Sequence, residues 1–293
     1  MKKGGIFMFS EHYNTRGGFS TDLACERRRA DTTVEGVDFK REKTAGGIWE
    51  RITISSDAGA RSIGRPRGHY DTLNLPRMDT LDYDGIDDAR EEVASQLCLM
   101  CERLDILPDK ILVLGLGNRE LTPDSIGPRC ADRVEATRHI KENDEDMFLG
   151  LECSEISVLC PGVSTSTGIS SQDAVLGICQ VARPSLILAI DAIAARSPVR
   201  LGTTIQFSDT GIFPGSGLGN HAYPINERVI GAPVIAIGVP TVMDARHFLA
   251  DSAGRHSGEY SGMFVSPKEI DGIVRASAAV IGGGINQAFG IDY

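Results

Sequence analysis

The sequence has few aromatic residues, no excess of basic residues and no long apolar run. Aromatic residues make up 6% of the 293 positions, so aliphatic side chains and 33 glycines must build the core and its turns. The net charge of −10 excludes a chain that binds nucleic acid directly through a basic surface. No stretch could span a membrane, and the apolar run in residues 1–10 is too short for a signal peptide. A cytoplasmic protein is therefore expected.

Metal-binding and nucleophile motifs are also missing. The seven cysteines are scattered, and the pair Cys98 and Cys101 has no second pair or neighbouring histidines to complete a zinc site. The six histidines show no compact ligand spacing, and no Gly-x-Ser-x-Gly turn occurs. We therefore expect no bound metal or other cofactor, free thiols, and chemistry carried by other side chains.

The remaining pattern predicts one α/β domain. Residues 1–22 are polar and glycine-rich without a sustained period, and we interpret them as a mobile arm ahead of a single domain at 23–293. Apolar runs of strand length alternate with helical patterns, which is typical of a three-layer α/β/α fold around a mostly parallel, twisted sheet. The expected strands cover 47–55, 111–116, 155–160, 186–190, 204–207 and 234–238, and the expected helices 86–104, 126–140, 171–182 and 266–289.

Two carboxylates follow two of these strands. Asp124 comes after the strand at 111–116, and Asp191 directly follows the strand at 186–190. In an open α/β sheet, the crevice beyond the carboxyl ends of the strands is where ligands bind. Each acid could instead cap a following helix. The alternative that the sequence favours is a paired-carboxylate site.

Three other motifs also have simpler interpretations. Gly115 and Gly117 begin a dinucleotide fingerprint, but the third glycine is replaced by Glu120, so a tight turn is favoured over nucleotide binding. Asp209 stands in a lone Asp-Thr-Gly string within an α/β pattern, which favours a turn residue over a pepsin-like catalytic acid. Asp244 ends another strand, where it could be a helix cap or part of the site.

A glycine-rich loop is the candidate for substrate binding. Gly215, Gly217 and Gly219 alternate with other residues, so their N–H groups could hold a peptide backbone or an oxyanion. The alternative is an ordinary surface loop. Gly215, Gly217, Gly219 and Asp244 are the predicted substrate-binding residues.

The proposed chemistry follows from the properties of a carboxyl pair. Two carboxylates that share a site cannot both ionise cheaply, so one keeps a proton. The pair then supplies a general base and a general acid, which together can activate water against an amide bond. A metal-dependent hydrolase with the same acids as ligands, and a non-enzymatic module that binds peptide or phosphate, remain alternatives.

Together these motifs resemble the germination protease family, the endopeptidases that degrade small acid-soluble spore proteins. The matching runs appear in the same order over most of the chain: 21–24, 114–118, 122–128, 161–163, 189–197, 208–212, 214–220, 238–242 and 266–271. The family's two proposed catalytic acids fall on Asp124 and Asp191. The chain departs from the family in one place: it has only a short segment at 246–265, where well-known members carry a much longer insertion.

The resemblance implies further properties. It implies an atypical aspartic peptidase of the spore core, made as a tetrameric zymogen that cleaves itself, with small acid-soluble spore proteins as substrate. The implied fold is phosphorylase/hydrolase-like and similar to hydrogenase maturation endopeptidases. Because the corresponding acids of those endopeptidases bind nickel, a nickel or zinc site is the alternative to a metal-free pair.

The arm supplies a candidate self-cleavage site. The run from Thr21 to Ala24 places an acid before an aliphatic and a small residue, similar to the Glu-Ile/Phe-Ala sites that the family cuts. Since the arm is expected to be mobile, the bond between Asp22 and Leu23 should be accessible. We predict self-cleavage there, triggered by mildly acidic pH because the carboxyl pair needs one proton.

Overall fold

The computed structural model describes residues 21–28, 34–214, 223–247 and 262–291. Its strands are β1 (Val37–Lys43), β2 (Ile48–Ile54), β3 (Gly68–Asn74), β4 (Lys110–Gly115), β5 (Glu155–Leu159), β6 (Leu186–Ala195), β7 (Thr204–Ser208), β8 (Val234–Asp244) and β9 (Phe264–Val265). Its α-helices are α1 (Ala24–Arg27), α2 (Asp57–Ile63), α3 (Tyr83–Arg103), α4 (Ile126–Ala131), α5 (Arg138–Asn143), α6 (Glu145–Gly150), α7 (Ser164–Thr167), α8 (Ser171–Ala182), α9 (Glu227–Ile230) and α11 (Ile270–Ala288). The described residues also form the short 3₁₀ helices η1 (Met78–Thr80), η2 (Thr122–Asp124) and η3 (Pro198–Arg200).

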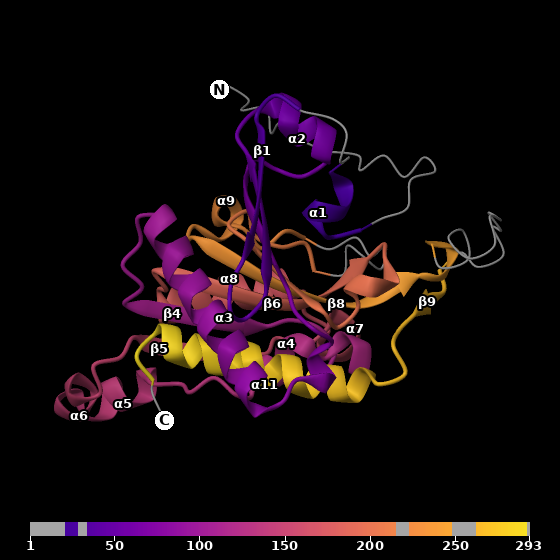
Figure 1. Ribbon diagram of the computed structural model, residues 1–293. Coiled ribbons are helices and arrows are strands. Elements are labelled where there is room, and N and C mark those ends of the chain that lie inside the picture. Colours follow the sequence, from indigo (N-terminus) through magenta and orange to yellow (C-terminus); the bar gives the residue numbers. More distant parts are fainter. Residues whose placement is uncertain (1–20, 29–33, 215–222, 248–261, 292–293) are drawn as a thin grey trace, which may run out of the picture.

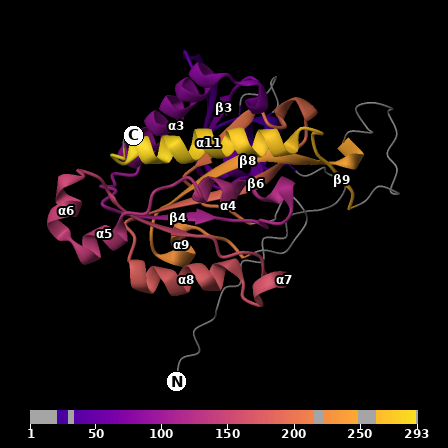
Figure 2. The same ribbon diagram turned by 90° about the horizontal axis from the view of Figure 1, so that it is seen from below.

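One mixed sheet forms the middle layer, in the order β1-β2-β3-β7-β8-β6-β4-β5, with β9 paired to β8. Figure 2 shows α3, α4 and α11 on one side of this sheet and α7 and α8 on the other. The α/β class predicted from the sequence is confirmed. Figure 1 places β1, α1 and α2 at the end of the molecule away from α11.

The prediction of a mostly parallel sheet is wrong. Parallel pairing joins β5, β4, β6 and β8, whereas β1, β2, β3 and β7 pair antiparallel with their neighbours and β7 pairs antiparallel with β8. Part of the difference lies in β3, which is not among the strands expected from the sequence. Its polar Asp71 is buried because Arg51, Gln96 and Arg103 donate hydrogen bonds to its carboxylate. A strand that buries a charged residue this way does not show apolar alternation.

Strand alternation divides the core into two faces. Leu188 and Ile190 of β6 pack with α3 and α11 in the larger cluster, while Ile187 and Ala189 pack toward Val175 of α8. All of these side chains are fully buried. Truncating one buried leucine or isoleucine to alanine lowers the free energy of unfolding by roughly 2–5 kcal/mol. The two helical layers therefore pack on both faces of the parallel strands next to which the candidate acids lie.

The predicted helix at 126–140 is two helices. It stops at Ala131 because the next backbone groups find partners elsewhere: the Asn286 side chain of α11 donates to the Arg133 carbonyl and accepts from the Glu135 N–H. Thr137 donates to the Ser154 carbonyl and accepts from the Ile156 N–H beside β5. Long-range hydrogen bonds thus override the local helical pattern.

Candidate active site

The turn after β4 holds Asp124. The Leu116 N–H donates to the Ile190 carbonyl of β6 at 2.8 Å, which fixes the turn against the neighbouring strand. Gly117 has φ +106, and a Cβ there would come within 2.1 Å of the Asp124 carbonyl oxygen. Only glycine allows this approach. The Asn118 N–H then donates to the Asp124 carboxylate at 2.8 Å, so the Gly-Asn turn and η2 form one unit.

The environment of Asp124 favours its protonated form. Burial raises the pKa of this carboxyl, and the hydrogen bond from the Asn118 N–H opposes burial only in part. Asp124 therefore keeps its proton to a higher pH than an ordinary aspartate, as a general acid requires.

Asp191 lies inside β6, not on a strand-to-helix connection as the sequence suggested. The strand continues to Ala195 because it pairs with β8 as far as Met243, through an irregularity between Ile193 and Ala194. Asp191 is 3% exposed, and its carboxylate accepts a hydrogen bond from the Ala192 N–H at 2.9 Å. Its neighbour across the ladder is Gly238, which has no side chain to crowd the carboxylate.

One acid follows a strand and the other lies on the adjacent parallel strand. Asp124 follows β4, Asp191 is on β6, and the bond from Leu116 to Ile190 joins the two strands next to both acids. Gly127, at the start of α4, packs here as well, since a Cβ would meet the carbonyl oxygens of Leu116 and Ile190 at 2.2 and 2.4 Å. The topology thus brings both acids near the carboxyl end of β4, while β6 continues beyond Asp191 to Ala195.

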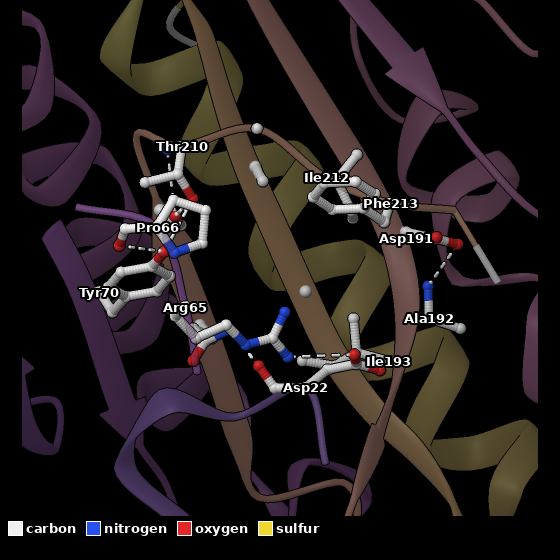
Figure 3. A pocket seen from close by; sticks show the side chains of 15 residues that line it. Asp22, Arg65, Pro66, Tyr70, Asp191, Ala192, Ile193, Thr210, Ile212 and Phe213 are labelled. Carbon is white, nitrogen blue, oxygen red and sulfur yellow. Dashed lines mark hydrogen bonds and ion pairs between the residues drawn. The ribbon is translucent and has the colours of Figure 1, made fainter. Parts of the chain in front are cut away.

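A cavity opens beside Asp191 (Figure 3). Asp22, Arg65, Gln206 and Ser208 provide much of its polar lining. Apolar lining comes from Ile193, Ile212 and Phe213. Asp124 and Asp244 are not among the described residues that line it.

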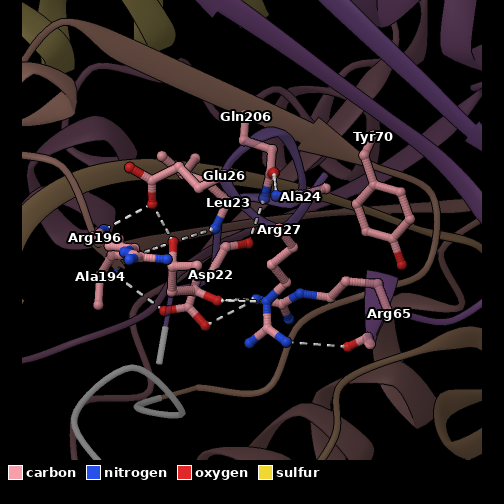
Figure 4. A network of polar contacts seen from close by, with 12 residues as sticks. Asp22, Leu23, Ala24, Glu26, Arg27, Arg65, Tyr70, Ala194, Arg196 and Gln206 are labelled. Carbon is pink, nitrogen blue, oxygen red and sulfur yellow. Dashed lines mark hydrogen bonds and ion pairs between the residues drawn. The ribbon is translucent and has the colours of Figure 1, made fainter. Parts of the chain in front are cut away.

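The segment around the predicted cleavage site is docked in this region, so the expectation of an accessible bond is wrong. Thr21 is 4% exposed, and Leu23 and Ala24 are fully buried. The Asp22 N–H donates to the Ala194 carbonyl at 2.9 Å, and the Asp22 carboxylate accepts from the Ala194 N–H at 2.9 Å (Figure 4). Tertiary hydrogen bonds and apolar burial, which local composition does not reveal, hold residues 21–24 in place.

The other candidates have different surroundings. Asp244 ends β8, where burial alone would raise its pKa, but the hydrogen bonds and charge of Arg246 outweigh burial and hold that pKa below its usual value. It is therefore an ion-paired carboxylate. Asp209 lies at the bend after β7 and binds the backbone and ring of His69, consistent with a turn residue. Gly215, Gly217 and Gly219 lie outside the described residues.

The donor set does not fit a transition metal. Within the ranges that the structure describes, no group of three His, Cys, Asp or Glu side chains is arranged to hold a metal ion. Two aspartates without nitrogen or sulfur ligands are a poor site for zinc or nickel. In the same ranges, no helix is long and apolar enough to cross a membrane.

Two polar residues of the cavity were missed by sequence reasoning. Arg65 stands in a short Arg-Pro-Arg loop, and Gln206 sits in the middle of β7. Gln206 gave no signal, because it occupies a polar position in a strand where polar residues alternate with Ile205 and Phe207. Arg65 gave no signal, because an arginine in a loop is usually solvated.

Comparison with known proteins identifies similar sequences. The sequence profile of the germination protease family matches residues 19–255. The germination protease of Caldanaerobacter subterraneus subsp. tengcongensis is 35% identical over 92% of this chain and 94% of its own. The germination protease of Clostridium perfringens strain ATCC 13124 is 34% identical over 94% of this chain and 95% of its own. The germination protease of Bacillus subtilis strain 168 is 37% identical over 79% of this chain and 65% of its own.

A solved structure is also similar. The [NiFe] hydrogenase maturation protease HycI from Thermococcus kodakarensis KOD1 matches 62% of this chain and 92% of its own, with 16% identity and a TM-score of 0.37. A score this low carries no argument about shared chemistry.

Proposed function

Because the chain belongs to the germination protease family and is a peptidase, we propose that it is a self-processing endopeptidase that hydrolyses small acid-soluble spore proteins in the spore core during germination. The observation that supports this most is the cavity beside Asp191, which Asp22 helps to line, together with the hydrogen bonds that hold residues 21–24 next to it. A homotetrameric zymogen is part of the same proposal.

The proposed mechanism uses the two acids in sequence. Ionised Asp191 takes a proton from a water molecule whose oxygen attacks the scissile carbonyl carbon. Protonated Asp124 donates its proton to the amide nitrogen as the C–N bond breaks. The raised pKa of Asp124 supports this assignment. The cycle ends with the proton on Asp191, and proton exchange with solvent restores the starting state.

Cleavage of a spore protein in the presence of a chelator tests the proposal. Purified protein should cut a small acid-soluble spore protein, and a strong chelator should leave the rate unchanged because carboxyls alone activate the water. Intact-mass analysis of the products gives the cut sites. Activity lost with the chelator and restored by nickel or zinc would favour the metal-dependent alternative. Binding without cleavage would favour the non-enzymatic module.

The pH dependence of cleavage follows from Asp124. Its folded-state pKa lies above the ordinary value of about 3.9. Activity needs the protonated form, so kcat/KM should fall as the pH rises through this raised pKa and be highest in mildly acidic solution. A kcat/KM profile on a peptide without titratable groups near the cut checks this. A profile that keeps rising toward alkaline pH would contradict the assignment.

Self-processing at the bond between Asp22 and Leu23 remains part of the proposal, with one added condition. Both residues are held against β6, and Glu26 accepts hydrogen bonds from the N–H groups of Arg196 and Ser197. Residues 21–28 must therefore loosen from these contacts, so that water can reach the buried bond between Asp22 and Leu23, before cleavage. Local opening of this kind precedes cleavage of buried segments.

A further inference from the structure

The backbone of residues 21–24 is held by groups that any polypeptide could use. The Asp22 N–H donates to the Ala194 carbonyl at 2.9 Å. The Gln206 side chain donates to the Asp22 carbonyl at 3.1 Å and accepts from the Ala24 N–H at 2.8 Å, so one amide spans two residues of the segment (Figure 4). These contacts are made to main-chain groups, so they do not depend on the side chains of the segment that is bound.

Three side chains of the segment meet three different surroundings. The Asp22 carboxylate accepts hydrogen bonds from Arg65 at 3.1 Å and from the Ala194 N–H at 2.9 Å. Leu23 lies in an apolar cluster with Ile193, Ala195, Leu201 and Met243. Ala24 is fully buried in a cluster with Ile52, Ile54, Ile63 and Tyr70. The site is complementary to an acid followed by an aliphatic and a small residue.

Arg65 is the charged group of this site. Its side chain and that of Asp22 are each only 12% exposed, so both charges are largely removed from water. Arg65 also donates to the Thr21 carbonyl at 3.0 Å, and its buried Nε has no hydrogen-bond partner within the described residues. A neutral side chain in place of Asp22 would leave a buried guanidinium without its counter-ion, which is costly.

We infer that Arg65 is a specificity-determining residue of this peptidase: it selects a carboxylate side chain in the substrate, and residues 21–24 occupy the place that a substrate segment takes. The inference rests on the proposed function. Arg65 binds the acidic side chain of the substrate, while Gln206 and the Ala194 backbone bind its main chain. Arg65 touches the substrate side chain and takes no part in the proton transfers.

Peptide hydrolysis by charge variants tests the inference. The substrates have the sequence of residues 17–28, with serine in place of Cys25, and carry Asp, Asn or Lys at the position of Asp22. The full chain should prefer the Asp peptide over the Asn peptide by roughly 10- to 100-fold in kcat/KM, the range for a hydrogen bond to a charged partner. Arg65→Gln should bring this ratio close to one, and Arg65→Glu should favour the Lys peptide.

Arg67→Gln is the matched control. Arg67 lies two residues away, its side chain is 60% exposed, and it pairs with the exposed Asp57, so the variant should keep the wild-type ratio. If Arg65→Gln or Arg65→Glu fails to fold, Arg65→Lys retains the charge and must still prefer the Asp peptide. An unchanged ratio in Arg65→Gln overturns the inference and leaves the proposed function standing. A wild-type chain that cuts neither the peptides nor a spore protein overturns both.

Discussion

Replacing Asp124 or Asp191 by asparagine should lower kcat/KM for peptide cleavage by about 10³-fold or more. An amide can neither accept a proton from water nor donate one to the leaving amine, so either substitution stops one half of the proposed mechanism. Steady-state hydrolysis of a single peptide by each variant measures the loss. Asp84→Asn, an exposed aspartate of α3, is the control and should retain full activity.

The same variants should remain folded. Burial raises the pKa of Asp124, so the folded chain binds this proton more tightly than the unfolded chain. The stability from this group is therefore present below the ordinary pKa of aspartate and is lost as the pH rises through the raised value. At neutral pH, Asp124→Asn should leave Tm unchanged or raise it. A variant that loses activity only because it unfolds would show a clearly lower Tm, and near wild-type turnover would make the residue structural.

Self-cleavage should convert the chain completely to a form that begins at Leu23. After incubation at mildly acidic pH, the wild type should shorten while Asp191→Asn stays full length, because the variant lacks the base. N-terminal sequencing and intact mass identify the new end. Leu23 and Ala24 are fully buried, so opening of residues 21–28 should limit the rate.

A variant that loosens the segment tests this order of events. Glu26→Ala removes the acceptor for the N–H groups of Arg196 and Ser197 and should speed conversion. Wild type and Asp191→Asn trimmed alike would indicate a contaminating protease. A wild type that is never trimmed would refute the zymogen proposal.

The elements that could be predicted from the sequence are those whose position is set by their own apolar pattern and not by contacts with distant residues. The helix at 171–182 was placed correctly because Ser170 caps it, accepting from the Asp173 N–H, and Val175 faces the sheet. The last helix begins at Ile270, later than the expected start at 266, and the Ser266 hydroxyl donates to the Thr241 carbonyl of β8.

The candidate site was predictable only where its residues follow an apolar run in the sequence. Asp124 and Asp191 were predicted because each follows a long apolar run, and the two runs pair as the parallel strands β4 and β6. Arg65 and Gln206 were missed because their importance depends on residues 21–24, which reach them from far away in the sequence. The docking of that segment depends on β3 and β7, and local patterns predicted neither their antiparallel pairing nor the cavity beside them.

The central claim is that Asp124 and Asp191 act as one acid–base unit, and the double variant tests it most directly. The measurement is kcat/KM for one peptide with the wild type, each single asparagine variant and the double variant. Since removing either member disables the whole unit, the double variant should be about as slow as the slower single variant. Losses that multiply, so that the double variant is slower by the product of the two single losses, would show that the acids act independently and would contradict the account.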